Sequence, residues 1–187
     1  MSLPPLATQA DAALYGYTLP ADRADELLAR ASVRIRRAAG QPITPSTVTI
    51  QLAVEGSTLE LPAPPVIGVQ TVSAVARDGT LTALTGWWWD GEHLNLPDCE
   101  TSRAQVVYQR GWAVTPDGVV ELTCQVADRL SDTPRGMEVG IRERAIDDYR
   151  EVYAAEAVQA AGDLLAGELT ALQRELGPRC VWVVKST

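Results

Sequence analysis

The residues that could carry out chemistry are few and scattered. The single histidine, His93, follows Asp90-Gly91-Glu92 in a stretch typical of a β-turn. A Ser-His-Asp or Cys-His site would need His93 as its general base, yet no nucleophile motif lies near it and no G-x-S-x-G elbow occurs. We therefore predict that the protein is not an enzyme and has no catalytic residues, and keep a small hydrolase using His93 as an alternative.

Two acidic pairs have the composition of a metal site. Asp147 and Asp148 are neighbours, and Asp128 and Asp132 are one helical turn apart. Adjacent side chains diverge, however, and acidic residues at i and i+4 are common on solvated helix faces. We therefore predict no metal site.

The number and spacing of the cysteines and the single lysine argue against disulfide, zinc and P-loop sites. Cys99, Cys124 and Cys180 are odd in number, far apart and never in a C-x-x-C pair, which argues against a disulfide framework or a zinc site. We expect free thiols, buried or partly buried. Lys185 is the only lysine and no G-x-x-x-x-G-K-[ST] sequence occurs, so a phosphate-binding P-loop is excluded. We predict no cofactor.

The most basic stretch is a candidate binding face. Arg30, Arg34 and Arg37 fall on one face of the helix expected there. Such a face grips phosphates or carboxylates of a partner, or it is a solvated face supported by a pair between Glu26 and Arg30. The net charge of -8 and the pI of about 4.7 favour a protein partner over DNA or an anionic membrane.

Three consecutive tryptophans form a second candidate surface. In a strand, Trp87 and Trp89 share one face and Trp88 lies on the other, so both faces must cover an indole. The three either pack within a small β module or supply an aromatic anchor at a protein interface. The apolar run Cys180–Val184 also has two interpretations. It either packs on the helices of its own chain or adds a strand to a neighbouring subunit or partner.

Length and composition are those of one globular domain, alone or with an inserted module. Of the 187 residues, 46% are hydrophobic and 21% charged, so the chain can bury a sizeable core. No apolar run approaches the roughly 20 residues needed to span a bilayer. The first residues lack the basic start and apolar stretch of a secretion signal, and we expect an unprocessed cytoplasmic protein.

Apolar spacing predicts the helices. Residues 19–40 place apolar side chains at spacings of four, four and three, with acidic first turns, arginines in the last turn and Gly40 as a stop. The same period returns from 117 to about 132, and 164–176 predicts a short helix. Residues 141–161 are rich in helix formers without a clean stripe, and helix is one interpretation there.

Between the first two helices the period changes to two. Residues 48–54 alternate apolar and polar, 55–57 break the run and 59–61 resume it, which predicts a hairpin. Further strand candidates are 66–76, 80–84, 87–89, 92–96 and 104–109, with Asp78-Gly79 and Asp90-Gly91 as turns. We expect five to seven antiparallel strands.

The predicted fold class is α+β. It is a small helical bundle with an antiparallel β module inserted between the first and second long helices. The expected boundaries are an N-terminal arm and helix at 1–46, the inserted β module at 47–112, and C-terminal helices with a tail at 113–187.

In this order the segments resemble the head-to-tail adaptor, or connector, proteins of long-tailed bacteriophages, particularly those infecting actinobacteria. The resemblance is carried by Leu19–Ile43, Leu61–Val69 with Val72, Trp87–Leu96, Val106–Trp112 with Pro116, and Leu169–Leu176. None of these motifs is catalytic. Their order and spacing extend the likeness over nearly the whole chain.

The resemblance implies a structural virion protein. Its copies would form a ring, typically of twelve, docked beneath the portal and above the stopper or tail-completion proteins in the virion neck, after assembly in the host cytoplasm. The ring would continue the channel through which DNA passes without specific binding, and no membrane is involved. An acidic balance suits such a channel, because phosphate contacts would retard DNA.

We also predict which residues meet partners. The portal-binding residues are Arg30, Arg34, Arg37, Val181, Trp182, Val183 and Val184. The inter-subunit residues are Trp87, Trp88, Trp89, Tyr149 and Tyr153.

The chain departs from the family in one segment. The family often carries a Ser-Glu-x-x-Gly-Asp-Tyr-Ser-Val-x-Tyr type sequence that looks like an extended arm between subunits, whereas here 142–153 lacks the glycine and serine. Residues 141–155 are therefore either an arm or a helix. Another neck protein, such as a tail terminator, is the main alternative, but it should lack the long helix before the β insert.

Overall fold

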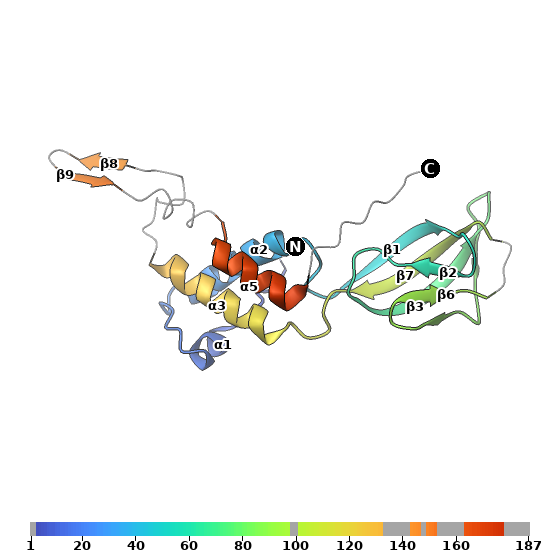
Figure 1. The fold of residues 1–187 in the computed structure, drawn as a ribbon, viewed down its shortest axis with the longest axis horizontal. Coiled ribbons are helices and arrows are strands. Elements are labelled where there is room, and N and C mark those ends of the chain that lie inside the picture. Colours follow the sequence, from blue (N-terminus) through green and yellow to red (C-terminus); the bar gives the residue numbers. More distant parts are fainter. Residues whose placement is uncertain (1–2, 98–100, 133–142, 147–148, 153–162, 178–187) are drawn as a thin grey trace. The chain divides into compact units, whose positions relative to one another are not determined.

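The structure is a computed structural model that describes residues 3–97, 101–132, 143–146, 149–152 and 163–177. They divide into two compact units, of which the first runs to Gly40 and resumes at Thr115 (Figure 1). The second unit is Gln41–Val114. The first is mainly helical and the second is built of antiparallel sheets, so the predicted α+β class with a β module between two long helices is confirmed.

The first long helix carries the predicted apolar stripe. Helix α2 (Ala24–Ala39) fully buries Leu27, Ala31 and Ile35, and Gly40 ends it in the left-handed region at φ 66°. The predicted start at residue 19 is wrong. A turn precedes the helix, in which Arg23 N donates to Pro20 O at 3.0 Å.

A short helix before it was not predicted. Helix α1 (Gln9–Leu14) begins with a capping box, in which Asp11 N donates to Thr8 Oγ1 at 3.2 Å and Thr8 N donates to Asp11 Oδ2 at 2.7 Å. Six residues are too few to display a helical period, so the cap was the only signal available in the sequence.

Helix α3 forms the centre of the helical unit. Both α3 (Asp117–Ser131) and α5 (Ala166–Leu176) lie where the sequence predicts helices. Helix α3 contacts α1, α2 and α5. Its apolar face is almost completely buried because it packs against three neighbours. The fully buried residues are Val119, Thr123, Cys124, Val126, Ala127 and Leu130.

An ion pair joins the end of α3 to the beginning of α5. Arg129 Nε donates to Glu168 Oε1 and Arg129 Nη2 donates to Glu168 Oε2, each at 2.9 Å. The Arg129 side chain is 21% exposed and the Glu168 side chain 4%. Leu165 N also donates to Glu168 Oε2 at 2.7 Å, and Arg129 Nη2 donates to Asp163 O at 3.3 Å. The pair therefore holds Asp132 and Asp163, which flank residues 133–162, close to one helical interface.

Part of that segment forms a small sheet. Strand β8 (Glu143–Ile146) pairs antiparallel with β9 (Tyr149–Val152). The helical interpretation of 141–161 is wrong for these eight residues, which fits the missing apolar stripe. The rest of 141–161 lies outside the described residues.

Seven strands form two antiparallel sheets in the second unit, in the orders β1-β7-β3-β4 and β2-β6-β5. The strands are β1 (Ser46–Ala53), β2 (Thr58–Glu60), β3 (Val66–Val75), β4 (Leu81–Ala83), β5 (Trp88–Trp89), β6 (His93–Asn95) and β7 (Arg103–Arg110). The two predicted Asp-Gly turns are present. Thr80 N donates to Asp78 Oδ1 at 2.9 Å, and His93 N and Glu92 N donate to Asp90 Oδ1 at 2.6 and 2.8 Å. These backbone hydrogen bonds lower the pKa of both aspartates.

The predicted hairpin between 48–54 and 59–61 is wrong. Strand β1 pairs with β7 over eight residues, whereas β2 pairs with β6 in the other sheet. The reason is burial. Leu59 of β2 lies opposite Leu94 of β6, and both are buried in the core.

Side chains from both sheets build one core. Its buried members are Leu59, Leu61, Val72, Leu94, Leu96, Ala104, Val106 and Tyr108. Tyr108 is fully buried, and its hydroxyl donates to Pro62 O at 2.7 Å. Its pKa is raised by burial.

The two ends of the β unit meet at Gly111. Gly111 N donates to Pro65 O at 2.8 Å, and Trp112 N donates to Ile43 O at 2.9 Å. A Cβ added at Gly111 would lie 2.7 Å from Thr44 O, and φ is 103°. Only glycine fits this close backbone approach. Of the helices in the described ranges, none is long and apolar enough to cross a bilayer.

Gly111→Ala should lower the free energy of unfolding by about 3 kcal/mol, because it combines left-handed strain with a clash against backbone. Gly56→Ala is the matched control, since Gly56 has φ 93° but open space around its Cβ position. It should cost about 1 kcal/mol. Urea unfolding measures both, and equal costs would show that the approach to Thr44 is not restrictive.

Arg129→Ala should cost about 3 kcal/mol, because it leaves the buried Glu168 carboxylate without its cation. Arg174→Ala is the control, since Arg174 is exposed on α5, and it should change stability by less than about 0.5 kcal/mol. Thermal unfolding of the two variants compares them. A similar melting temperature for both would contradict a structural role for the ion pair.

Candidate functional site

His93 lies beside a pocket in which the described lining residues provide no hydroxyl or thiol nucleophile. Its Nε2 is 4.0 Å from Glu60 Oε1. The pocket has a volume of about 410 Å³, and Pro64, Pro65 and Trp89 form part of its wall. Among the described residues that line it, none is a serine, threonine or cysteine. The described arrangement therefore offers an imidazole and carboxylates without a side-chain hydroxyl or thiol for them to activate.

The other candidates for chemistry are equally sparse. In the part of the chain that the structure describes, no three His, Cys, Asp or Glu side chains come together as metal ligands. Asp147 and Asp148 lie outside that part. Cys124 is a buried free thiol, as expected, and burial raises its pKa to about 11. Such a thiol is a poor nucleophile. Cys99 and Cys180 lie outside the described residues.

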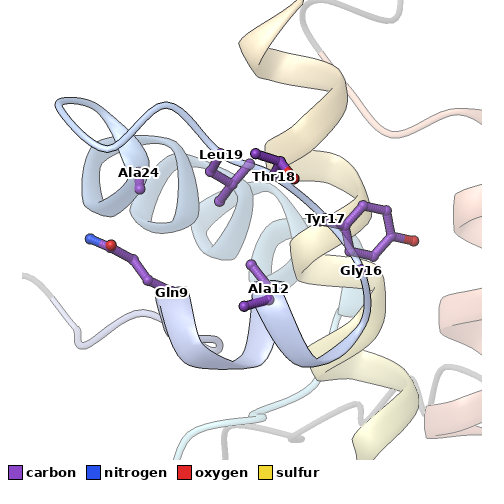
Figure 2. Close-up of a pocket in the computed structure, with 8 residues that line it drawn as sticks. Gln9, Ala12, Gly16, Tyr17, Thr18, Leu19 and Ala24 are labelled. Carbon is purple, nitrogen blue, oxygen red and sulfur yellow. The ribbon is translucent and has the colours of Figure 1, made fainter.

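A second pocket, which the sequence did not predict, lies at the start of the helical unit (Figure 2). Gln9 and Ala12 of α1, Tyr17 and Leu19 of the connection, and Ala24 of α2 contribute to its wall, and its volume is about 320 Å³. Burial and nearby acidic groups raise the pKa of Tyr17. No described lining residue is an acid or a histidine, so this pocket has no acid-base pair.

The arginine face is only partly open. Arg30 forms the predicted pair with Glu26, with Nη1 and Oε1 3.7 Å apart. Arg34 is half-buried and Arg37 is exposed. Arg36, on the same helix, donates to Pro4 O and so ties α2 to the N-terminal segment. Of the three predicted partner-binding arginines, Arg37 is the most accessible.

The tryptophans divide as the strand geometry predicts. Trp87 and Trp89 pack against the core of the β unit. Trp88 is 58% exposed, on β5 at the edge of the three-stranded sheet. A large exposed aromatic side chain on an edge strand is the kind of group that anchors protein interfaces.

The remaining predicted contact residues are described in part or not at all. Tyr149 begins β9. Tyr153 and the run Val181–Val184 lie outside the described residues. The structure therefore brings together no single site from the predicted set, but leaves separate surfaces at Arg37 and Trp88.

Solved structures contain chains of the same fold. A chain in the "Neck of empty GTA particle computed with C6 symmetry" is similar over 100% of this chain and 96% of its own length, with a TM-score of 0.50 and 15% identity. A chain in the "Virion of native gene transfer agent (GTA) particle" is similar over the same shares, with a TM-score of 0.50 and 16% identity. This chain has their fold. No protein-family model and no curated protein matches it.

Alanine substitutions of Trp89 and Trp88 distinguish a tryptophan that packs in the core from one that lies on the surface. Trp89→Ala should lower the free energy of unfolding by about 3 kcal/mol, because it opens the core of the β unit. Trp88→Ala should change it by less than about 0.5 kcal/mol, because most of that side chain is in solvent. Chemical unfolding checks both variants, and a large cost for Trp88→Ala would show that this indole packs within its own chain.

Proposed function

We propose that this protein is a structural component of the neck of a phage-like virion, forming a ring that joins the capsid portal to the tail. The observation that carries the proposal is the likeness of fold over the full chain to a chain from the neck of a gene transfer agent particle. The order of motifs supports the same conclusion, because it resembles that of head-to-tail adaptors.

Two motif segments of that resemblance are physically joined. Tyr108 and Gly111, in the stretch Val106–Trp112, hydrogen-bond to Pro62 O and Pro65 O in the stretch Leu61–Val69. These two segments therefore belong to one structural unit. This supports a protein that works through its shape.

The proposed ring is mechanical. About twelve copies surround the channel. The neck structure that contains the similar chain was computed with sixfold symmetry. The net charge of -8 keeps the protein from gripping the DNA that passes through. In this proposal Arg30, Arg34, Arg37 and the run Val181–Val184 face the portal. The residues between copies are Trp87, Trp88, Trp89, Tyr149 and Tyr153, with Trp88 as the exposed anchor. A stopper or tail terminator binds the other side of the ring.

A different neck protein and an enzyme are the competing functions. Helix α2 precedes the β unit, which favours an adaptor over a tail terminator. A hydrolase would need His93, and His93→Ala would then abolish its turnover. Among its described lining residues, the pocket beside His93 has no hydroxyl or thiol nucleophile, which disfavours a hydrolase of the Ser-His-Asp or Cys-His kind.

The test is the mass of the purified protein by light scattering, alone and after mixing with the portal complex of the same particle. We expect the protein to join the portal as a stoichiometric ring. Arg37→Glu should weaken that binding at least tenfold, because it reverses the charge of the exposed arginine on α2. Arg174→Glu on α5 is the control and should bind normally. A protein that ignores the portal would refute the adaptor.

A further inference from the structure

Among the described strands, none lies along one of the two long edges of β1 (Figure 1). Strand β1 is the end strand of its sheet and pairs with β7 alone among the described strands. The register runs from Ser46 opposite Arg110 to Ala53 opposite Arg103 without a shift, whereas β3 carries two irregularities against β7. The β1 sequence, Ser-Thr-Val-Thr-Ile-Gln-Leu-Ala, contains no charge, proline or glycine. It thus lacks the charges, prolines and bulges that usually prevent an edge strand from pairing with another chain.

In β1, the backbone N–H and C=O groups of every second residue face this edge. Val54 N donates to Ser102 O at 2.9 Å and so continues the ladder with β7. Because pairs alternate in an antiparallel ladder, the even-numbered residues of β1 direct their N–H and C=O groups at β7. The residues whose backbone groups face the open edge are Thr47, Thr49, Gln51 and Ala53.

The apolar face of β1 is incompletely covered. Val48, Ile50 and Leu52 pack against the core but are only half-buried. Their partners on β7, Ala104, Val106 and Tyr108, are fully buried. A further strand along β1 would complete this burial if it carried apolar residues in the same phase.

A second copy of β1 meets each of these requirements. We propose that two copies of this chain pair β1 against β1, antiparallel, about a two-fold axis at Ile50. Thr49 then exchanges backbone hydrogen bonds with the partner's Gln51. On the apolar face Ile50 meets the partner's Ile50, and Val48 meets the partner's Leu52. No like charges oppose each other, because β1 carries none.

This pairing does not rest on the proposed ring. A ring whose copies all point the same way contains no two-fold axis between neighbours. The pair is therefore the form of the free protein, and the open edge of β1 is released when copies enter a ring.

The first test is the mass of the free protein by light scattering at micromolar concentration. We expect twice the chain mass of 20.1 kDa. Gln51→Pro should have the mass of one chain, because it removes an edge-facing N–H while sparing the ladder with β7. Gln51→Ala keeps that N–H and should remain paired. A wild-type protein that is monomeric up to 100 μM, or a Gln51→Pro protein that stays dimeric, would overturn the proposal.

Cysteine cross-linking tests the register without relying on the proline variant. In a background of Cys99→Ser, Cys124→Ala and Cys180→Ser, Ile50→Cys should form a disulfide-linked dimer under mild oxidation. The two cysteines would then face each other in a non-hydrogen-bonded pair, with Cα atoms about 4.5 Å apart. Val48→Cys is the control, because the two copies of residue 48 would be about 13 Å apart along the strands. Val48→Cys with Leu52→Cys should cross-link again.

The cross-linking outcomes are decisive in both directions. Dimers from Ile50→Cys and from the double variant, but not from Val48→Cys, establish the register. Equal cross-linking of Ile50→Cys and Val48→Cys, or none from either, refutes it. Failure of portal binding would leave these results unchanged, so the two proposals are judged separately.

Discussion

The backbone contact between Gly111 and Thr44 is the constraint on which the architecture depends. It brings the residues just before β1 and just after β7 together, and Trp112 N donates a hydrogen bond to Ile43 O at the same place. Because the chain enters and leaves the β unit at neighbouring points, the insertion does not separate the helices that flank it in sequence. Helices α2 and α3, on either side of the insertion in sequence, therefore still pack against each other.

Local patterns predicted most of the elements. The burial stripe of α2, the helix α3 and the two Asp-Gly turns follow from spacing and turn chemistry that operate within a few residues. The opposite faces of Trp88 and Trp89 follow from the pleat of a strand. Each of these outcomes is decided by neighbours in sequence, which is why the sequence reveals them.

Strand pairing and surface roles were beyond such reasoning. The alternation in 48–54 marks a strand but does not say whether β2 or β7 lies beside it, because that choice depends on where Leu59 finds a core. The pair of Arg129 and Glu168 spans 39 positions and carries no motif. The same holds for accessibility, since helical spacing grouped Arg30, Arg34 and Arg37 but did not show that Arg37 is the exposed one.

The ion pair of Arg129 and Glu168 also bears on how such a chain can evolve. It joins the end of α3, from which residues 133–162 depart, to the start of α5, to which they return. Loss of either partner alone would leave the other charge uncompensated at this junction, so the two positions are expected to be exchanged together during evolution.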